Sequence, residues 1–239
     1  MSEEVKTEKK KFFLFNISEN TLEVLTAILL GVTALLSAWS GWIGSLHGGN
    51  QATNYTKSNN MSATGNSMYN EAAQYYMQDV MTWNNINGYL FDKEVALANG
   101  NKKEAELIDE KIDTLMYHNC SEEFLEAIEW AFDQEEDVTP FDKEGFVDSY
   151  FADANEVLDE AEAILEEGQQ DNSNGDAFGL VSVILSLVLF LLGIIGIFKQ
   201  LPNRRIILCV SIVFLLVATI YMFTIPMPTG FSFASFFNH

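Results

Sequence analysis

The sequence predicts an all-helical integral membrane protein, with three transmembrane helices and a helical extracytoplasmic domain between the first and the second. Two observations lead to this fold class. Three long stretches carry no Asp, Glu, Lys or Arg, and the roughly 130 residues between the first two of them are acidic and nearly free of strand patterns. Apolar stretches of about 20 residues are long enough to cross the hydrocarbon core of a bilayer as helices.

The first apolar stretch covers residues 24–46 and follows a basic and aromatic N-terminus, residues 1–23. Asn20 and Glu23 form the pattern of a helix-capping pair, which places the start of the helix close to the stretch. A cleaved signal peptide is the alternative, but its apolar core would be shorter than these 23 residues. We therefore expect a retained anchor helix after a cytoplasmic segment.

An acidic helical domain is expected over residues 47–176, which hold 29 acidic and six basic residues. Apolar residues recur there at helical spacing, and Pro140 is the one clear break. The predicted helices cover residues 50–99 (with an interruption near Gly88), 102–117, 121–134 and the amphipathic stretch 146–168. The polar sequence GQQDNSNGD then leads into the second span, either as a loop or as a frayed helix end.

The second and third spans are predicted over residues 177–198 and 206–226, joined by the basic loop 199–205. Three basic residues lie in this loop, and four lysines precede the first span. Because loops rich in Lys and Arg resist translocation, we expect both to be cytoplasmic. The sequence thus predicts a multi-pass protein of the plasma membrane, with its N-terminus cytoplasmic and both the acidic domain and the aromatic tail, residues 227–239, extracytoplasmic.

Small and hydroxyl-bearing residues follow one side of the first span, within about 40° of one line at 100° per residue. These residues, the small-residue stripe, are Thr26, Thr33, Ser37, Ser40 and Gly44. Small residues let helices approach closely in lipid, where no hydrophobic drive brings them together. Alternatively, several copies turn the stripe inward around water, as in a channel. Both interpretations predict a homo-oligomer, because a single copy has only three spans to cover the stripe.

The second span carries a similar set of small residues, which we expect to receive the first span. The set consists of Gly179, Ser182, Ser186 and Gly193. Outside the membrane, the net charge of about −23 over residues 47–176 would concentrate cations and repel anions at the mouth of a pore. The plainer interpretation of this charge is a solvated acidic surface.

One stretch of the acidic domain has part of the spacing of a calcium-binding loop. Its candidate ligands, at positions 1, 3, 5 and 12, are Asp133, Glu135, Asp137 and Glu144. Val138 stands where the sharp turn of such a loop needs Gly, and Pro140 occupies position 8, so the match is incomplete. Calcium is the one cofactor that this spacing suggests. His118 and Cys120 supply too few soft ligands for zinc.

No motif of an enzyme is visible: the sequence has no nucleophile elbow and no phosphate-binding Gly loop. Its two cysteines, Cys120 and Cys209, lie in different segments and predict no disulfide framework. His47, at the membrane exit, is either a pH-responsive group or an interfacial polar residue. We therefore predict a non-enzymatic protein whose partners are the lipid bilayer, further copies of the chain and cations, with no nucleic acid.

Two stretches of the chain resemble a group of prokaryotic three-span membrane proteins of uncharacterised activity. They are AWSGWIGSLHGGNQATNY, residues 38–55, and EEGQQDNSNGDAFGLVSVILSLVLFLLGI, residues 166–194. The resemblance implies an anchor helix, an extracytoplasmic helical domain and a closing helix pair. It implies no activity, and the acidic middle of this chain departs from the pattern of the group.

The sequence leaves two hypotheses for function. In the first, a homo-oligomer forms a cation-permeable channel with an acidic outer vestibule. In the alternative, the protein is a membrane-anchored extracytoplasmic sensor or scaffold, in which the acidic helices bind a partner or divalent cations and the spans only hold the copies together.

Overall fold

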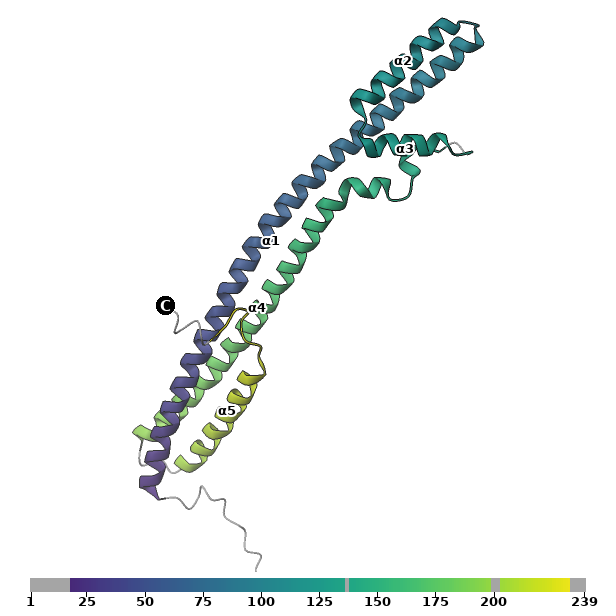
Figure 1. Ribbon diagram of the computed structural model, residues 1–239. Helices are drawn as coiled ribbons and strands as arrows, with labels where there is room; N and C mark the ends of the chain where they lie inside the picture. Colours follow the sequence, from purple (N-terminus) through teal and green to yellow (C-terminus); the bar gives the residue numbers. More distant parts are fainter. Residues whose placement is uncertain (1–17, 136–137, 199–202, 233–239) are drawn as a thin grey trace, which may run out of the picture. The chain divides into compact units, whose positions relative to one another are not determined.

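The computed structural model describes residues 18–135, 138–198 and 203–232, and over these ranges it contains helices and no strand. The helices are α1 (Glu19–Ala98), α2 (Lys102–Asn119), α3 (Glu122–Phe132), the short 3₁₀ helix η2 (Pro140–Asp142), α4 (Phe146–Ile197) and α5 (Arg204–Thr224) (Figure 1). Three of them, α1, α4 and α5, are long and apolar enough to cross a membrane. The predictions of an all-helical fold and of a multi-pass membrane protein are confirmed at this level.

Helix α1 is a single helix of 80 residues. No Pro occurs within it, and Gly48, Gly49 and Gly88 keep helical geometry, so the interruption predicted near Gly88 is absent. The side chain of Ser18 accepts a hydrogen bond from the backbone N–H of Thr21, which places the start of the helix earlier than the predicted capping pair. After Ala98, a glycine with φ of +79°, Gly100, turns the chain back into α2.

Helix α4 is also unbroken, and it contains the polar sequence GQQDNSNGD that the sequence left open between a loop and a helix end. Two glycines of this sequence lie against α1. A Cβ atom on Gly168 would come within 2.6 Å of the Tyr55 ring, and one on Gly175 would meet the carbonyl oxygen of Gly44 at 3.6 Å. The small residues therefore let α1 and α4 pack closely where the sequence is least apolar.

The chain divides into two compact units. The described residues within 1–55 and 165–239 form the membrane unit, which contains the three apolar stretches, and those within 56–164 form the acidic unit. The membrane unit extends beyond the predicted spans, which end at residue 46 and begin again at residue 177. Close packing between α1 and α4 continues through these polar extensions, as the contacts of Gly168 and Gly175 indicate.

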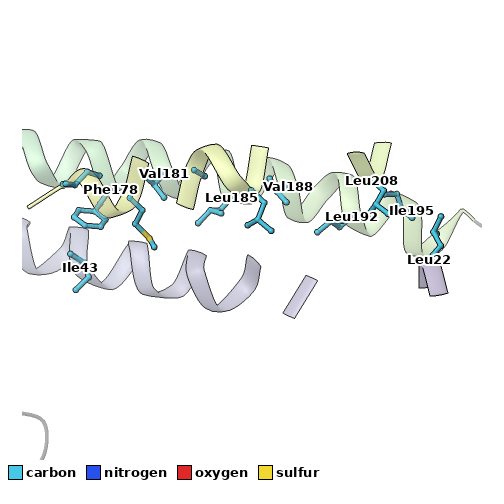
Figure 2. Close-up of a cluster of buried hydrophobic side chains, with 13 residues drawn as sticks. Leu22, Ile43, Phe178, Val181, Leu185, Val188, Leu192, Ile195 and Leu208 are labelled. Atoms are coloured by element: carbon cyan, nitrogen blue, oxygen red, sulfur yellow. The ribbon is translucent and has the colours of Figure 1, made fainter. Parts of the chain in front are cut away.

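One side of α4 forms the core of the membrane unit. Its buried side chains recur at alternating steps of three and four residues, a spacing of 3.5 residues per turn that is typical of helices that wind around each other. We call this set the α4 seam, and it consists of Phe178, Val181, Leu185, Val188, Leu192 and Ile195. Figure 2 shows Phe178 directed toward Ile43 of α1, and Ile195 close to Leu22 of α1 and Leu208 of α5.

The end of the membrane unit where α1 begins is held by a buried arginine. Arg204, the first residue of α5, is 5% exposed and donates to the carboxylate of Glu19 at 2.9 Å. It also donates to the carbonyl oxygen of Ile195 at 3.1 Å, and Arg205 lies 3.5 Å from Glu19. Two of the three basic residues of the predicted loop thus join α1, α4 and α5, whereas Lys199 lies outside the described residues.

The acidic unit has a core of its own, built from the second part of α1, α2, α3 and the start of α4. Its fully buried side chains include Ile86, Phe124 and Ile128. Ser121 caps α3, because its side-chain oxygen accepts from the backbone N–H of Phe124 at 3.1 Å. Gly65 of α1 is also required for packing here, since a Cβ atom would lie 2.8 Å from the Leu158 side chain.

Candidate functional site

The small-residue stripe of the first span is largely buried inside one chain. Thr26, Thr33 and Ser40 are 2%, 0% and 0% exposed, while Ser37 and Gly44 are half-buried. The hydroxyl of Ser40 donates to the carbonyl oxygen of Phe178 on α4 at 2.9 Å. A Cβ atom on Gly44 would lie 3.3 Å from Cβ of Phe178. Ser40 and Gly44 therefore pack on the chain's own second span, and the burial of Thr26, Thr33 and Ser40 needs no further copy of the chain.

The small residues of the second span differ in exposure. Gly179 and Ser186 are exposed, Ser182 and Gly193 are half-buried, and Cβ atoms on the two glycines would meet nothing within 4 Å. In the structure, the first span contacts α4 through the larger side chains of the α4 seam, which begins with Phe178. A large side chain fills the space beside Gly44, so the close approach needs a small residue on one helix only.

His47 lies in the membrane unit as part of a buried polar cluster. Its ring is 1% exposed and stacks on Phe178. Nδ1 lies 2.7 Å from Oδ1 of Asp171 on α4, and Nε2 lies 3.1 Å from the carbonyl oxygen of Pro226, which follows α5. Because a carbonyl oxygen can only accept, Nε2 donates to Pro226, and the contact with Asp171 needs one further proton on either partner. One histidine thus joins three segments.

The aromatic tail begins with a contact to the first span. The ring of Phe231 lies 6.1 Å from the ring of Trp39 and 5.7 Å from that of Trp42, both edge-on. Such edge-to-face arrangements are favourable between aromatic rings. The remaining phenylalanines of the tail lie outside the described residues.

The acidic unit contains an open groove of about 470 Å³. The described lining residues come from three segments: α1, the residues from the end of α2 to the start of α3, and the start of α4. The lining residues are Ala72, Tyr75, Gln78, Asp79, Asn119, Ser121, Glu123, Phe146, Ser149 and Tyr150. We call it the Asp79 groove, after the one carboxylate in this set that is buried.

Asp79 is 7% exposed, and its Oδ2 accepts a hydrogen bond of 2.5 Å from the Tyr150 hydroxyl. Burial raises the pKa of Asp79 above its ordinary value, and the hydrogen bond from Tyr150 opposes this shift. Burial, with the neighbouring Asp79 adding to it, also raises the pKa of the Tyr150 hydroxyl. The hydroxyl therefore remains a donor at neutral pH, and Asp79 holds a proton more readily than a surface aspartate does.

Cys120 follows α2 beside this pair. Burial and the negative charge of Asp79 raise the pKa of the Cys120 thiol to about 11. Since the thiolate is the reactive form, the thiol is a poor nucleophile at neutral pH. Both Cys120 and Cys209 are free.

The predicted calcium ligands are not brought together among the described residues. Asp133 ends α3, Glu135 and Glu144 are exposed, and Asp137 lies outside the described residues. Nearby, the backbone N–H and the hydroxyl of Thr139 both donate to Asp142 at 2.8 Å, which caps η2. No group of three His, Cys, Asp or Glu side chains in the described ranges is placed to hold a metal ion. Calcium binding stays a prediction.

Sequence inspection missed three residues that the structure gathers: Asp79, Tyr150 and Asp171. A signal for the two aspartates was present. Asp79 follows Ser58, Gly65 and Ala72 at steps of seven residues, and Asp171 stands three residues after Gly168. Residues at such steps lie on one side of a helix that packs on another. A carboxylate on a side that is otherwise small or apolar indicates a buried partner.

Comparisons of the chain with protein-family models, with curated proteins and with solved structures found no match. The resemblance to the group of three-span membrane proteins stays a prediction, and the candidate sites rest on their own geometry.

Proposed function

We propose that this protein is a membrane-anchored sensor, in which the spans hold an acidic helical unit outside the cytoplasm and that unit binds a ligand. One observation carries the proposal: α1 and α4 each run without a break from an apolar span into the acidic unit. Two residues of the Asp79 groove, Asp79 and Tyr150, thus belong to the same two helices as His47 and Asp171. A ligand that changes the packing of α1 on α4 acts on helices that also form the membrane unit.

The charge distribution supports this arrangement. The basic residues of the chain outside 47–176 lie before the first span and in the connection between the second and third, where loops resist translocation. The acidic domain and the C-terminus then lie on the opposite side. We place the N-terminus in the cytoplasm and the acidic unit outside it, in the plasma membrane.

A cation-permeable channel is the second candidate. It requires the small-residue stripe to face water between several copies. Thr26, Thr33 and Ser40 are already buried within one chain, so they do not face water between copies. This burial favours the sensor. The strong negative charge of the acidic unit is the observation that speaks for the channel, since it would attract cations. Homo-oligomer formation stays a prediction in both cases.

Cysteine labelling in intact cells or spheroplasts tests the proposed orientation. Cys120 is unsuited as a reporter, because a pKa raised from 9.0 to about 11 lowers its thiolate fraction about 100-fold. In a Cys120→Ser, Cys209→Ser background we would introduce Tyr117→Cys, where the side chain is 82% exposed. We expect a membrane-impermeant maleimide to label this variant in intact cells.

Asn203→Cys in the same background is the matched control. Asn203 is exposed and directly precedes α5, so it is expected to react only after the membrane is permeabilised. Labelling of Asn203→Cys but not of Tyr117→Cys in intact cells would contradict the orientation and, with it, an extracytoplasmic sensor.

A further inference from the structure

The Asp79 groove has the polarity of a site for a positively charged ligand. Two carboxylates line it, from Asp79 and Glu123, and none of the described residues that line it is Lys, Arg or His. An anionic ligand would find no countercharge there, within a segment that already carries a net charge of about −23. The groove therefore excludes anions and favours cations.

The buried carboxylate has an oxygen left to bind a ligand. Oδ2 of Asp79 accepts from Tyr150, whereas no other described residue donates a hydrogen bond to Oδ1. Asp79 is 93% buried and lines the groove, so bulk water solvates this carboxylate poorly. Oδ1 is not among the described side-chain atoms that are fully buried without a hydrogen bond, so it retains accessible surface. A donor in the groove would satisfy Oδ1.

The rest of the lining suits an organic cation. Tyr75, Phe146 and Tyr150 present aromatic surface, and aromatic rings attract ammonium groups as well as apolar carbon. Hydroxyl and amide groups from Ser149 and Gln78 offer further hydrogen bonds. The volume of about 470 Å³ lies within the range of pockets that bind small organic ligands, about 300–1,000 Å³.

A bare metal ion fits the groove less well. Calcium takes about six to eight oxygen ligands at 2.3–2.6 Å, several of them carboxylates. The described residues gather no three acidic or other metal-ligating side chains at this or any other place. Two carboxylates beside aromatic rings match an ammonium group with an apolar body more closely.

We propose that the Asp79 groove binds a small organic amine, with its ammonium group at Asp79 and Glu123 and its apolar part against Tyr75, Phe146 and Tyr150. This inference rests on the proposed function, because it names the class of ligand that the sensor binds. The ammonium group donates to Oδ1 of Asp79, while the hydrogen bond from Tyr150 to Oδ2 holds the carboxylate in place.

Binding of an amine to this site depends on pH in a defined direction. Burial raises the pKa of Asp79, so its neutral form persists to higher pH than that of an exposed aspartate. An ammonium ion prefers the carboxylate, so its affinity rises as pH increases through the titration of Asp79, and binding releases a proton. The groups that face Asp79 are Tyr150 and Cys120, which stay protonated at neutral pH, and Glu123 across the groove.

The test uses the full chain in nanodiscs, with empty nanodiscs as the blank, and calorimetry or ligand-observed NMR as the readout. The probes are phenethylamine, its neutral analogue 2-phenylethanol and its anionic analogue phenylacetate. We expect the amine to bind at least about tenfold more tightly than the alcohol, and the acid not to bind. Asp79→Asn should lower the affinity for the amine at least about tenfold and weaken its pH dependence.

Two further variants complete the design. Asp92→Asn is the matched control, because Asp92 is an exposed aspartate of α1 outside the lining, and it should bind the amine as the parent does. Ser149→Trp fills the groove without changing its charge and should also abolish binding, with far-UV circular dichroism to show that the variant is folded.

Equal binding of amine and alcohol, or an unchanged affinity in Asp79→Asn, would overturn the proposal. So would calcium binding at Asp79 without amine binding. Nanodiscs have no inside or outside, so these outcomes are independent of the labelling experiment. If no amine binds, the orientation found by labelling still stands. If the orientation is reversed, the binding result for the groove still stands.

Discussion

Replacing His47 with Leu is expected to destabilise the membrane unit by about 3–5 kcal/mol, because it removes one partner of a buried, hydrogen-bonded pair and leaves the other without its contact. The substitution leaves the Asp171 carboxylate, 8% exposed, against an apolar side chain. It also removes the donor to the Pro226 carbonyl oxygen. The measurement is unfolding in mixed micelles with increasing dodecyl sulfate, followed by circular dichroism and, in a Trp83→Phe, Trp130→Phe background, by the fluorescence of Trp39 and Trp42.

The double variant His47→Leu, Asp171→Leu is the informative partner of this experiment. Replacing both members of a buried pair with apolar residues is often neutral or stabilising, so the double variant should regain most of the lost stability. His118→Leu makes the same change at an exposed position of α2 and should alter stability little. If His47→Leu costs no more than His118→Leu, the cluster does not join α1, α4 and the segment after α5.

Gly168→Ala is expected to lower stability by about 1–3 kcal/mol, the usual cost of forcing extra volume into a packed interface. The new Cβ atom would lie 2.6 Å from the Tyr55 ring and 3.2 Å from Cβ of Asn54, so the two helices must separate or the ring must move. Replacing Tyr55 with Ala removes the ring. The double variant Tyr55→Ala, Gly168→Ala should therefore lose less than the sum of the two single variants.

Gly193→Ala provides a control of opposite sign on the same helix. A Cβ atom on Gly193 would meet nothing within 4 Å, and Ala favours a helix over Gly by about 0.5–1 kcal/mol. We expect this variant to be unchanged or slightly more stable in the same dodecyl sulfate titration. Equal effects at Gly168 and Gly193 would contradict the packing of the polar part of α4 against α1.

The helices could be predicted from composition and periodicity because these properties are local. The three uncharged stretches were sufficient to predict the three apolar helices. The predicted helix over 102–117 ends two residues before α2 does. The start of α1 was placed late because Ser18 supplies the cap in place of Asn20. The sequence alone did not decide whether GQQDNSNGD is helical, because its helical state depends on packing against α1. Gly168 and Gly175 permit that packing.

The partners of each helix side could not be predicted, because they depend on which segment lies opposite. Thr33 and Ser40, on the side of the first span that carries the small residues, are fully buried, but the residue of the second span that Ser40 contacts is Phe178 and not one of that span's small residues. The Asp79 groove is formed by three segments far apart in the chain, so a scan for local motifs could not find it. The seven-residue spacing of Ser58, Gly65, Ala72 and Asp79 marks a packed side of α1, but no spacing in the sequence relates Asp79 to Tyr150.

The rate at which Ser40→Cys reacts with a small, charged thiosulfonate reagent most directly tests whether the first span packs inside its own chain. The purified Cys120→Ser, Cys209→Ser protein in nanodiscs exposes both sides of the membrane to the reagent, and Tyr117→Cys gives the rate for an accessible thiol. We predict that Ser40→Cys stays unmodified while Tyr117→Cys reacts fully, since Ser40 is 0% exposed against Phe178. Rapid modification of Ser40→Cys would show that water reaches the small-residue stripe. This result would contradict packing of the stripe within its own chain and would favour a channel.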